Sequence, residues 1–268
     1  MTNLTSRQHE YLKAMGIDVW MPKDALAIEN VEQENPAVID LVSSAPPVVK
    51  PVSQSKPEPD AVVKTALQQM PASGLMDNDV STLDWNALQA RVAECRLCEL
   101  HLSRKQTVFG AGNKQADWLI IGEAPGIDED RQGEPFVGQA GLLLNAMLQA
   151  IGLARQQVYL ANILKCHPPK NRDPQSDEAS NCMMYLQRQI ELVQPKIILA
   201  LGRIAAQSLL QTNTSLVRLR GKVHYIEATS APVIVTYHPA YLMRSPLEKR
   251  NAWEDLLFAV RTMKEQTA

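Results

Sequence analysis

Short apolar runs alternate with helical patterns along residues 82–268. Four runs are rich in Val, Ile, Leu and Ala, which is typical of strands buried on both faces of a parallel sheet. They span 118–121, 158–164, 196–201 and 233–236. Apolar residues at helical spacing predict helices at 82–95, 141–151, 176–193, 203–210 and 248–266. This alternation predicts a three-layer α/β/α sandwich around a mainly parallel four-stranded sheet, within an α/β fold class.

The N-terminal part follows neither pattern for long. Residues 1–25 contain a short amphipathic stretch, interrupted at Gly16, that is too small to form its own core. Its apolar residues are Tyr11, Leu12, Met15, Ile17 and Trp20. We therefore expect a short helical docking peptide that needs a partner surface. Residues 26–81 are rich in Pro, Ser, Val and acidic residues, which predicts a disordered Pro-rich linker before the folded domain at 82–268.

Charge separates the same two parts. Residues 1–81 carry 6 Lys and Arg against 11 Asp and Glu, whereas the remainder carries 21 against 18. A mildly basic domain suits a transient anionic partner and falls short of a polybasic footprint. The chain has no signal-peptide pattern, and no apolar run approaches the roughly 18 residues of a membrane span. We therefore expect a cytoplasmic monomer that meets no membrane.

The first apolar run leads into a long polar segment. The sequence from Trp118 reads WLIIGEAPGIDEDRQGEPFVGQAG, in which Gly122 ends the run. Ligands of open α/β sheets bind beyond the carboxyl ends of the strands, so this segment lies at a candidate active site. Its candidate residues are Glu123, Asp128, Glu129, Asp130 and Phe136. An ordinary solvated connection is the alternative, which the length of the segment disfavours.

Two polar residues lie within or just after other predicted strands. Asn162 lies in the run 158–164, and His238 follows the run 233–236 closely. Either residue alone is more often structural, with satisfied hydrogen bonds. Together with the acidic segment they bring an amide, an imidazole and carboxylates to one edge of the sheet. Such a combination can bind and polarise a planar polar ligand, on which Phe136 could stack.

The four cysteines form a second constellation. Cys95 and Cys98 are spaced as CxxC, whereas Cys166 and Cys182 stand alone. In a reducing compartment this pattern favours a metal centre over disulfides. Zinc usually takes two paired motifs, so the solitary cysteines fit an iron–sulfur cluster better. Four unrelated buried cysteines are the alternative.

Three segments resemble a known family. GEAPGIDEDRQGEPFVGQAG, NILKCHPPKNRDP and HPAYLMR, together with the cysteine pattern, resemble the family 4 uracil-DNA glycosylases, the iron–sulfur branch of the uracil-DNA glycosylase superfamily. The resemblance covers 82–268. It implies a DNA repair hydrolase that flips uracil out of DNA and cleaves its N-glycosidic bond, leaving an abasic site. It also implies that Cys95, Cys98, Cys166 and Cys182 hold a [4Fe–4S] cluster.

The resemblance assigns the binding of the base to five positions. Asn162 reads the pairing edge of uracil, and Phe136 stacks on the base. Glu123 walls the site together with the backbone of Gly122 and Ala124, where it crowds the methyl group of thymine. Relatives that trap their product covalently carry an inserted basic loop after the first motif. Here GQAG continues directly, which implies ordinary turnover.

The resemblance also implies the catalytic roles. His238 donates a hydrogen bond to the uracil O2 atom, where negative charge develops. Glu129 positions the water and stabilises the sugar cation, with Asp128 and Asp130 as alternatives.

Contacts with DNA are expected outside the catalytic residues. Segment 239–244 should enter the duplex, where Leu242, Met243 or Arg244 fills the vacated stack. Phosphate contacts are expected from basic residues of two loops, namely Lys165, Lys170, Arg172, Arg220 and Lys222.

The N-terminal peptide carries a separate resemblance. The pattern Leu12-x-x-Met15-Gly16-Ile17-x-x-Trp20 resembles the N-terminal peptide of the psi subunit of the bacterial DNA polymerase III clamp loader. This implies a tether to the replisome at the nucleoid. Two alternatives remain open: an iron–sulfur nucleic-acid-binding sensor, and a replisome interaction protein, each without glycosylase activity.

Overall fold

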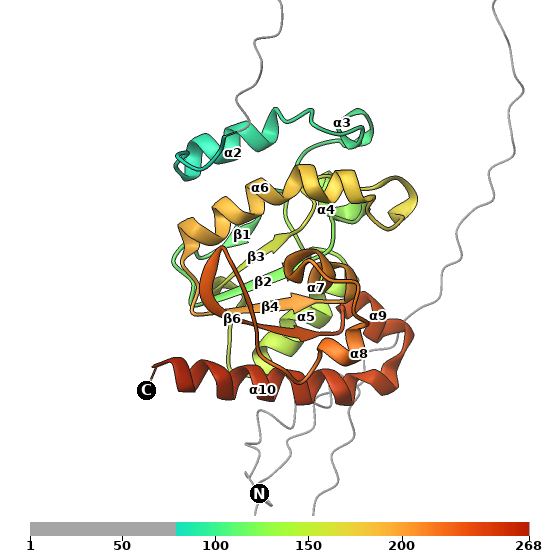
Figure 1. Cartoon of the computed structure of the whole chain (residues 1–268). Helices are drawn as coiled ribbons and strands as arrows, with labels where there is room; N and C mark the ends of the chain where they lie inside the picture. The colour runs from blue at the N-terminus through green and yellow to red at the C-terminus, as the bar shows by residue number, and fades with distance from the viewer. Residues whose placement is uncertain (1–78, 268) are drawn as a thin grey trace, which may run out of the picture. The chain divides into compact units, whose positions relative to one another are not determined.

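The computed structural model describes residues 79–267, which form a sheet enclosed by helices (Figure 1). The sheet has six strands in the order β1-β3-β2-β4-β6-β5. The four apolar runs form its parallel centre as β2 (Trp118–Gly122), β3 (Val158–Asn162), β4 (Ile197–Leu201) and β6 (Thr229–Thr236). Every residue of β2, β3 and β4 is buried, as expected for central parallel strands.

Two strands that the sequence did not predict form the edges of the sheet. β1 (Ala111–Gly112) pairs antiparallel with β3, and β5 (His224–Ile226) pairs antiparallel with β6. The sheet therefore has six strands instead of four, and it is mixed, with a parallel centre as predicted and two antiparallel edges. Strands of two and three residues are too short to show the alternation by which a strand is found in a sequence.

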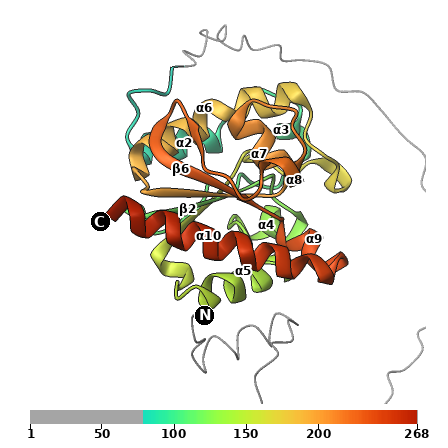
Figure 2. The same cartoon turned by 60° about the horizontal axis from the view of Figure 1, so that its bottom comes forward.

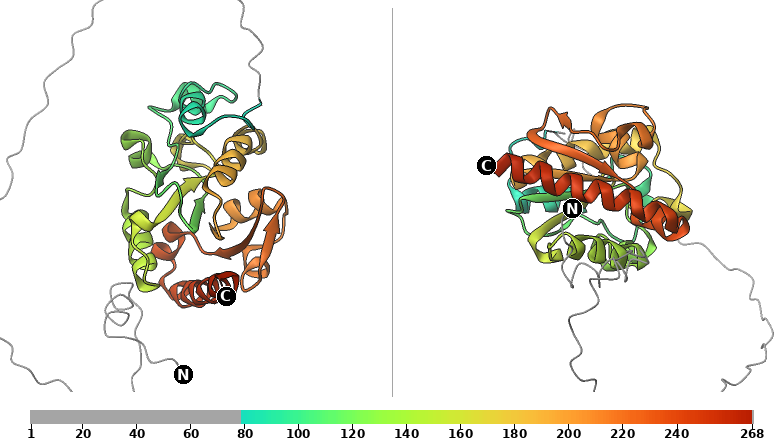
Figure 3. Two further views of the ribbon diagram at one scale, coloured as in Figure 1. Left: turned by 90° about the vertical axis from the view of Figure 1, so that its left-hand side faces the viewer. Right: turned by 90° about the horizontal axis from the view of Figure 1, so that it is seen from below.

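Helices cover both faces of the sheet (Figures 2 and 3). One face packs against α5 (Gln139–Ala150), α9 (Pro239–Arg244) and α10 (Lys249–Thr267). The other packs against α6 (Ser176–Val193), α7 (Arg203–Leu210) and α8 (Leu216–Leu219). The predicted three-layer α/β/α sandwich is confirmed.

Two N-terminal helices pack outside α6 (Figure 1). They are α2 (Trp85–Ala93) and α3 (Leu100–Ser103). The side chain of Asp84 caps α2 by accepting a hydrogen bond from Ala87 N at 2.8 Å, so the helix begins at Trp85, three residues after the predicted start at 82. The apolar cluster beneath these helices contains all four cysteines.

Several short helices were not predicted. The acidic segment contains α4 (Ile127–Gln132), and single turns occur at η2 (Arg155–Gln157), η3 (Pro169–Asn171) and η4 (Pro246–Glu248). A helix of one or two turns cannot show the repeated spacing that marks a longer one. By contrast α6 buries Cys182, Leu186, Gln189 and Val193 along one stripe, and its bounds agree with the prediction.

The predicted docking peptide 1–25 and the predicted linker lie outside the described residues, except for 79–81. These last three residues belong to the domain, because Val80 is buried in the cluster under α2. Within the described part of the chain, no helix is both long enough and apolar enough to cross a membrane.

Candidate active site

The carboxyl ends of the central strands meet at one edge of the sheet. Gly122 of β2 pairs in register with Asn162 of β3, and Leu201 of β4 pairs with Thr236 of β6. His238 follows the end of β6 by two residues. This edge is the place where parallel sheets bind their ligands.

Gly122 lets two side chains from different segments converge. A Cβ atom at this position would overlap Oδ1 of Asn162 and would lie 2.6 Å from Cζ of Phe136. Real Cβ atoms do not approach other atoms so closely, so any larger residue would displace one of these side chains. Gly122 is required here for close approach.

The side-chain oxygen of Asn162 is a buried acceptor without a donor. Asn162 is 3% exposed, and its Oδ1 atom has no hydrogen-bond partner within the described residues. Leaving a buried acceptor unpaired costs about 1–3 kcal/mol. Such a group in a folded protein needs an explanation, and a ligand that donates a hydrogen bond at this point provides one.

Phe136 is held in an uncommon backbone conformation. Its φ is 55°, in the left-handed region that bulky residues rarely adopt. The guanidinium of Arg155 donates to the carbonyl of Phe136 at 3.2 Å and to that of Pro135 at 2.6 Å. A Cβ atom on Gly141 would collide with the same Phe136 carbonyl. These contacts fix the ring 6.0 Å from that of His238, with the planes inclined by 31°.

His238 is positioned as a neutral hydrogen-bond donor. Its Nδ1 atom accepts from Ala240 N at 3.1 Å at the start of α9, so the proton of the neutral ring lies on Nε2. Burial, with a smaller contribution from the positive charge of Arg244, lowers the pKa of His238 from 6.5 to about 4. The ring therefore carries no charge at neutral pH. Gly202, with φ 89°, leaves room for the His238 side chain.

Glu123 has the most perturbed carboxyl group at this edge of the sheet. Burial, and then the negative charge of Asp173, raise the pKa of Glu123 from 4.5 to about 7, while Arg203 opposes the shift. Arg203 also forms an ion pair with Asp173 at 2.8 Å. A carboxyl group that titrates near neutrality is typical of functional sites.

The three acids of α4 have different surroundings. A Cβ atom on Gly138 would lie 3.4 Å from Oδ2 of Asp128 and 4.0 Å from Oε1 of Glu129, so both carboxylates lie beside the start of α5. Asp130 is buried, and its two oxygens accept from Lys105 N at 3.0 and 3.1 Å. Asp130 is therefore a structural anchor, which contradicts its expected role as an alternative to Glu129.

The four cysteines gather beneath α2 and α3. Cys166 and Cys182 are buried, and Cys95 and Cys98 are half-buried in the same apolar cluster. Burial raises the pKa of Cys166, and electrostatic repulsion from Cys98 and Cys95 raises it further. Burial also raises the pKa of Cys182, and repulsion from Cys166 and Cys95 adds to that shift. The thiols therefore lie within electrostatic range of one another.

Thiolates are the usual ligands of an iron–sulfur cluster. Among the residues described, no group of three or more His, Cys, Asp or Glu side chains is arranged to hold a metal ion. An iron–sulfur cluster takes one thiolate at each of its irons, which are spread over several ångströms. The four thiols, gathered from three segments of the chain, fit that requirement.

Arg104 connects this cysteine site to the chain around it. Its guanidinium donates to Cys166 Sγ at 3.0 Å, to the carbonyl of Cys95 at 2.9 Å and to that of Ala93 at 3.0 Å. The next residue, Lys105, binds Asp130 of α4. Sequence analysis missed Arg104 and also Arg155, because their partners lie far away along the chain and leave no local pattern.

Three residues that were predicted to contact phosphates instead have their side chains bonded inside the protein. Lys165 is only 1% exposed, so its role as a phosphate contact is contradicted. The Arg220 side chain is 13% exposed and pairs with Asp255 at 2.7 Å, which contradicts the same role for it. Arg172 makes a two-pronged ion pair with Glu178, at 2.6 and 2.8 Å, at the start of α6. Lys170 and Lys222 are exposed and remain candidates.

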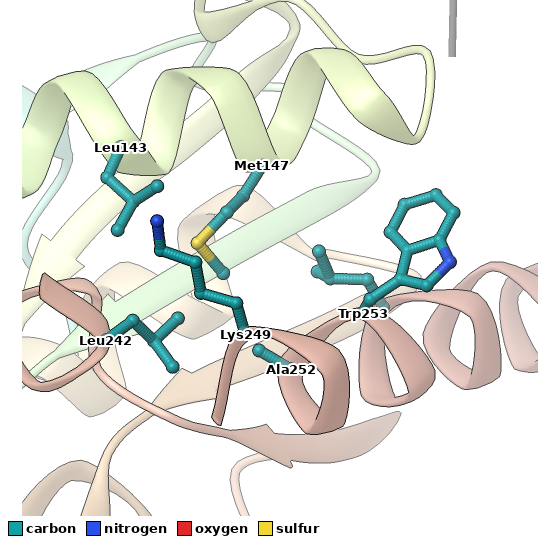
Figure 4. A pocket seen from close by; sticks show the side chains of 7 residues that line it. Leu143, Met147, Leu242, Lys249, Ala252 and Trp253 are labelled. Atoms are coloured by element: carbon teal, nitrogen blue, oxygen red, sulfur yellow. The ribbon is translucent and has the colours of Figure 1, made fainter. Parts of the chain in front are cut away.

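Leu242 cannot enter a duplex, because it belongs to the core. It is 1% exposed and points from α9 toward Leu143 and Met147 of α5 (Figure 4). The cavity left between α5, α9 and α10 measures only about 10 Å³, so the contact is close-packed. Its neighbours Met243 and Arg244 are exposed and remain candidates for the duplex contact.

Comparison with known proteins points to one family. The model of the Uracil DNA glycosylase superfamily matches residues 109–257. The type-4 uracil-DNA glycosylase of Archaeoglobus fulgidus is 46% identical over 161 residues, which cover 58% of this chain and 81% of that protein. The type-4 enzymes of Sulfurisphaera tokodaii and Thermotoga maritima are each 40% identical, over 63% and 58% of this chain and 80% and 81% of their own lengths.

The surroundings of His238 predict its titration. We expect ¹⁵N NMR to show a neutral ring with the proton on Nε2 and a pKa of about 4. Arg244→Gln, which removes a repelling charge, should raise that pKa toward 6.5. Because the folded-state pKa is below the unfolded one, the stability that His238 contributes should fall as pH drops from 6.5 toward 4. A charged ring at about pH 6, or a proton on Nδ1, would contradict this prediction.

Proposed function

This chain belongs to the uracil-DNA glycosylase superfamily, and we infer from that membership that it is a DNA repair enzyme that hydrolyses the N-glycosidic bond of uracil in DNA. The reaction releases uracil and leaves an abasic site. The observation that best supports this function is the buried, unpaired Oδ1 atom of Asn162 beside Gly122 and Phe136. A uracil placed there offers the missing donor.

The amide of Asn162 distinguishes uracil from cytosine by polarity. Its oxygen accepts from uracil N3–H and its nitrogen donates to O4. Cytosine has an acceptor at N3 and a donor at C4, so both hydrogen bonds would become repulsive contacts. Phe136 stacks on the face of the flipped base. Glu123, with the backbone at Gly122 and Ala124, lies where a thymine methyl group would have to fit.

Cleavage separates charge between the base and the sugar. His238 donates from Nε2 to the uracil O2 atom, where negative charge develops. The ring is neutral and oriented by Ala240 N, so the proton that it donates is already on Nε2. Glu129, with Asp128 beside it, positions the attacking water and stabilises the cationic sugar.

Contacts with the rest of the DNA come from exposed residues near this edge of the sheet. Uracil leaves the stack before it reaches the site, and Met243 or Arg244 of α9 fills the space that it leaves. Lys170 and Lys222 bind phosphates and contribute affinity without sequence preference.

The four cysteines hold a [4Fe–4S] cluster, with Cys95 and Cys98 following α2, Cys166 on the segment after β3 and Cys182 on α6. Held by these four thiolates, such a cluster would cross-link the three segments. The protein's own residues around it, including the hydrogen bond from Arg104 to Cys166, then hold the segment after β3 in place.

The role of Asn162 is tested by Asn162→Asp. The carboxylate loses the donor to uracil O4, so we expect kcat/KM for release of uracil from an oligonucleotide to fall by at least about 100-fold. Asn113→Asp is a matched control, because the new side chain keeps the acceptor that binds Gln115 N at 3.0 Å. Wild-type kcat/KM in Asn162→Asp would show that Asn162 does not read the base.

The metal content is tested by anaerobic purification. We expect a brown protein with about four irons per chain, as for a Cys₄ [4Fe–4S] site. Cys182→Ala should lose both iron and thermal stability, whereas Ser180→Ala, at an exposed position of the same helix, should keep them. Stoichiometric zinc without iron after anaerobic reconstitution would overturn the assignment.

The N-terminal peptide 1–25 is proposed to dock on the clamp loader of the replisome, which would deliver the enzyme to newly copied DNA at the nucleoid. The proposal is supported by the psi-like pattern and by the Pro-rich segment that follows it. A flexible tether raises local concentration without fixing orientation.

We expect the full chain to bind purified clamp-loader complex with a Kd of about 10 μM or lower. Trp20→Ala should abolish binding, and Lys13→Ala should leave it unchanged. Deletion of residues 1–25 should preserve uracil release in vitro. Binding that is indifferent to Trp20 would refute the docking role and leave the enzyme assignment intact.

A further inference from the structure

Lys165 carries a fully buried amino group close to Asn162, the residue proposed to recognise the base. Its Nζ atom donates to the carbonyl oxygen of Asn162 at 2.8 Å and to Oε1 of Gln189 at 2.6 Å. A cation is tolerated inside a protein only when it is well bonded, because its transfer from water is costly. Both bonds are therefore needed to keep Lys165 where it is.

Gln189 is the other buried member of this network. It lies on α6 with 0% exposure, and its Nε2 atom donates to the carbonyl of Phe109 at 2.9 Å and to the hydroxyl of Tyr159 at 3.4 Å. These two acceptors fix the amide nitrogen, so the amide oxygen must face Lys165. The orientation of Gln189 is thus determined by groups outside the active site.

The network ends on the peptide group that carries Asn162. Asn162 is the last residue of β3, and its side-chain oxygen has no hydrogen-bond partner within the described residues. The direction of that side chain consequently depends on its backbone, whose carbonyl is held by Lys165. A small rotation of this peptide group would move the amide relative to Gly122 and Phe136, which already crowd it.

We propose that Gln189 is a positioning residue that acts through Lys165 to hold Asn162 in the orientation that recognises uracil. The proposal rests on the proposed function and adds the residues that set its geometry. Helix α6 then has two roles, because it carries both Cys182 and Gln189, the side chain that orients the amide of Asn162.

The test removes both polar partners together. Gln189→Met alone would leave a buried ammonium short of an acceptor, and the resulting loss of stability would obscure the effect. The double variant Lys165→Met/Gln189→Met keeps chain length and volume and removes the buried charge together with its side-chain acceptor. The carbonyls of Asn162 and Phe109 lose a donor in this variant, so its thermal stability is measured as well. Gln187→Met, at an exposed position of the same helix, is the matched control.

Four quantities are measured on anaerobically purified full chain: iron content, affinity for abasic-site DNA, inhibition by free uracil, and kcat/KM for uracil release. In the double variant we expect wild-type iron content and abasic-DNA affinity. Inhibition by uracil should weaken, and kcat/KM should fall, by about 10- to 100-fold, as for other small misplacements of a binding group. Gln187→Met should match wild type in all four.

A conservative variant keeps the test decisive if the double variant folds poorly. Gln189→Glu retains an acceptor for Lys165 and, when protonated, a donor for the carbonyl of Phe109, so it should keep inhibition by uracil within about threefold of wild type. The proposal is overturned if Gln189→Glu loses uracil binding as severely as Asn162→Asp. It is also overturned if the double variant binds uracil normally, or if its affinities for uracil and abasic DNA fall in equal proportion. Absence of uracil release by wild type would overturn the proposed function together with this inference.

Discussion

The parallel pairing of β2 with β3 is the constraint on which the active site depends. It places Gly122 opposite Asn162 and continues beyond the strands, because Ile163 N donates to the carbonyl of Gly122 and Leu164 N to that of Glu123, both at 3.0 Å. The two segments that carry the site therefore leave the sheet together. A slip of one residue would turn Asn162 to the opposite face of the sheet and separate it from Phe136.

The same pairing connects the cysteine site to the reacting groups by two routes. Cys166 follows Lys165, which holds the backbone of Asn162. On the other side, Arg104 binds Cys166 while Lys105 binds Asp130 at the centre of α4, the helix that carries Glu129. The cysteine site is thus connected to Asn162 and to the helix of Glu129, the residues to which the proposed function gives recognition of the base and action on the sugar.

Features that depend on neighbouring residues could be predicted from the sequence. Features that depend on contacts with residues far along the chain were missed. Unbroken apolar runs identified β2, β3 and β4, because a strand buried on both faces needs no partner to be recognised. Asn162 and His238 became candidates because polar residues in or just after such runs are conspicuous, and the structure brings the ends of their strands to one edge of the sheet. Lys165 and Arg220 were assigned to DNA from their charge alone, whereas their actual partners, Gln189 and Asp255, lie 24 and 35 residues away.

Under the proposed function, the fixed backbone of Phe136 leaves the change of shape during recognition to the nucleic acid. Arg155 and Gly141 lock the aromatic platform before any base arrives, so the protein has little freedom to adapt. The deformation falls on the nucleic acid, which spends a few kcal/mol in turning a nucleotide out of its stack. Bases that open readily reach the platform most often. A uracil opposite guanine, which is the product of cytosine deamination, is paired more weakly than one opposite adenine. The mutagenic lesion would therefore reach the site more often than uracil paired with adenine.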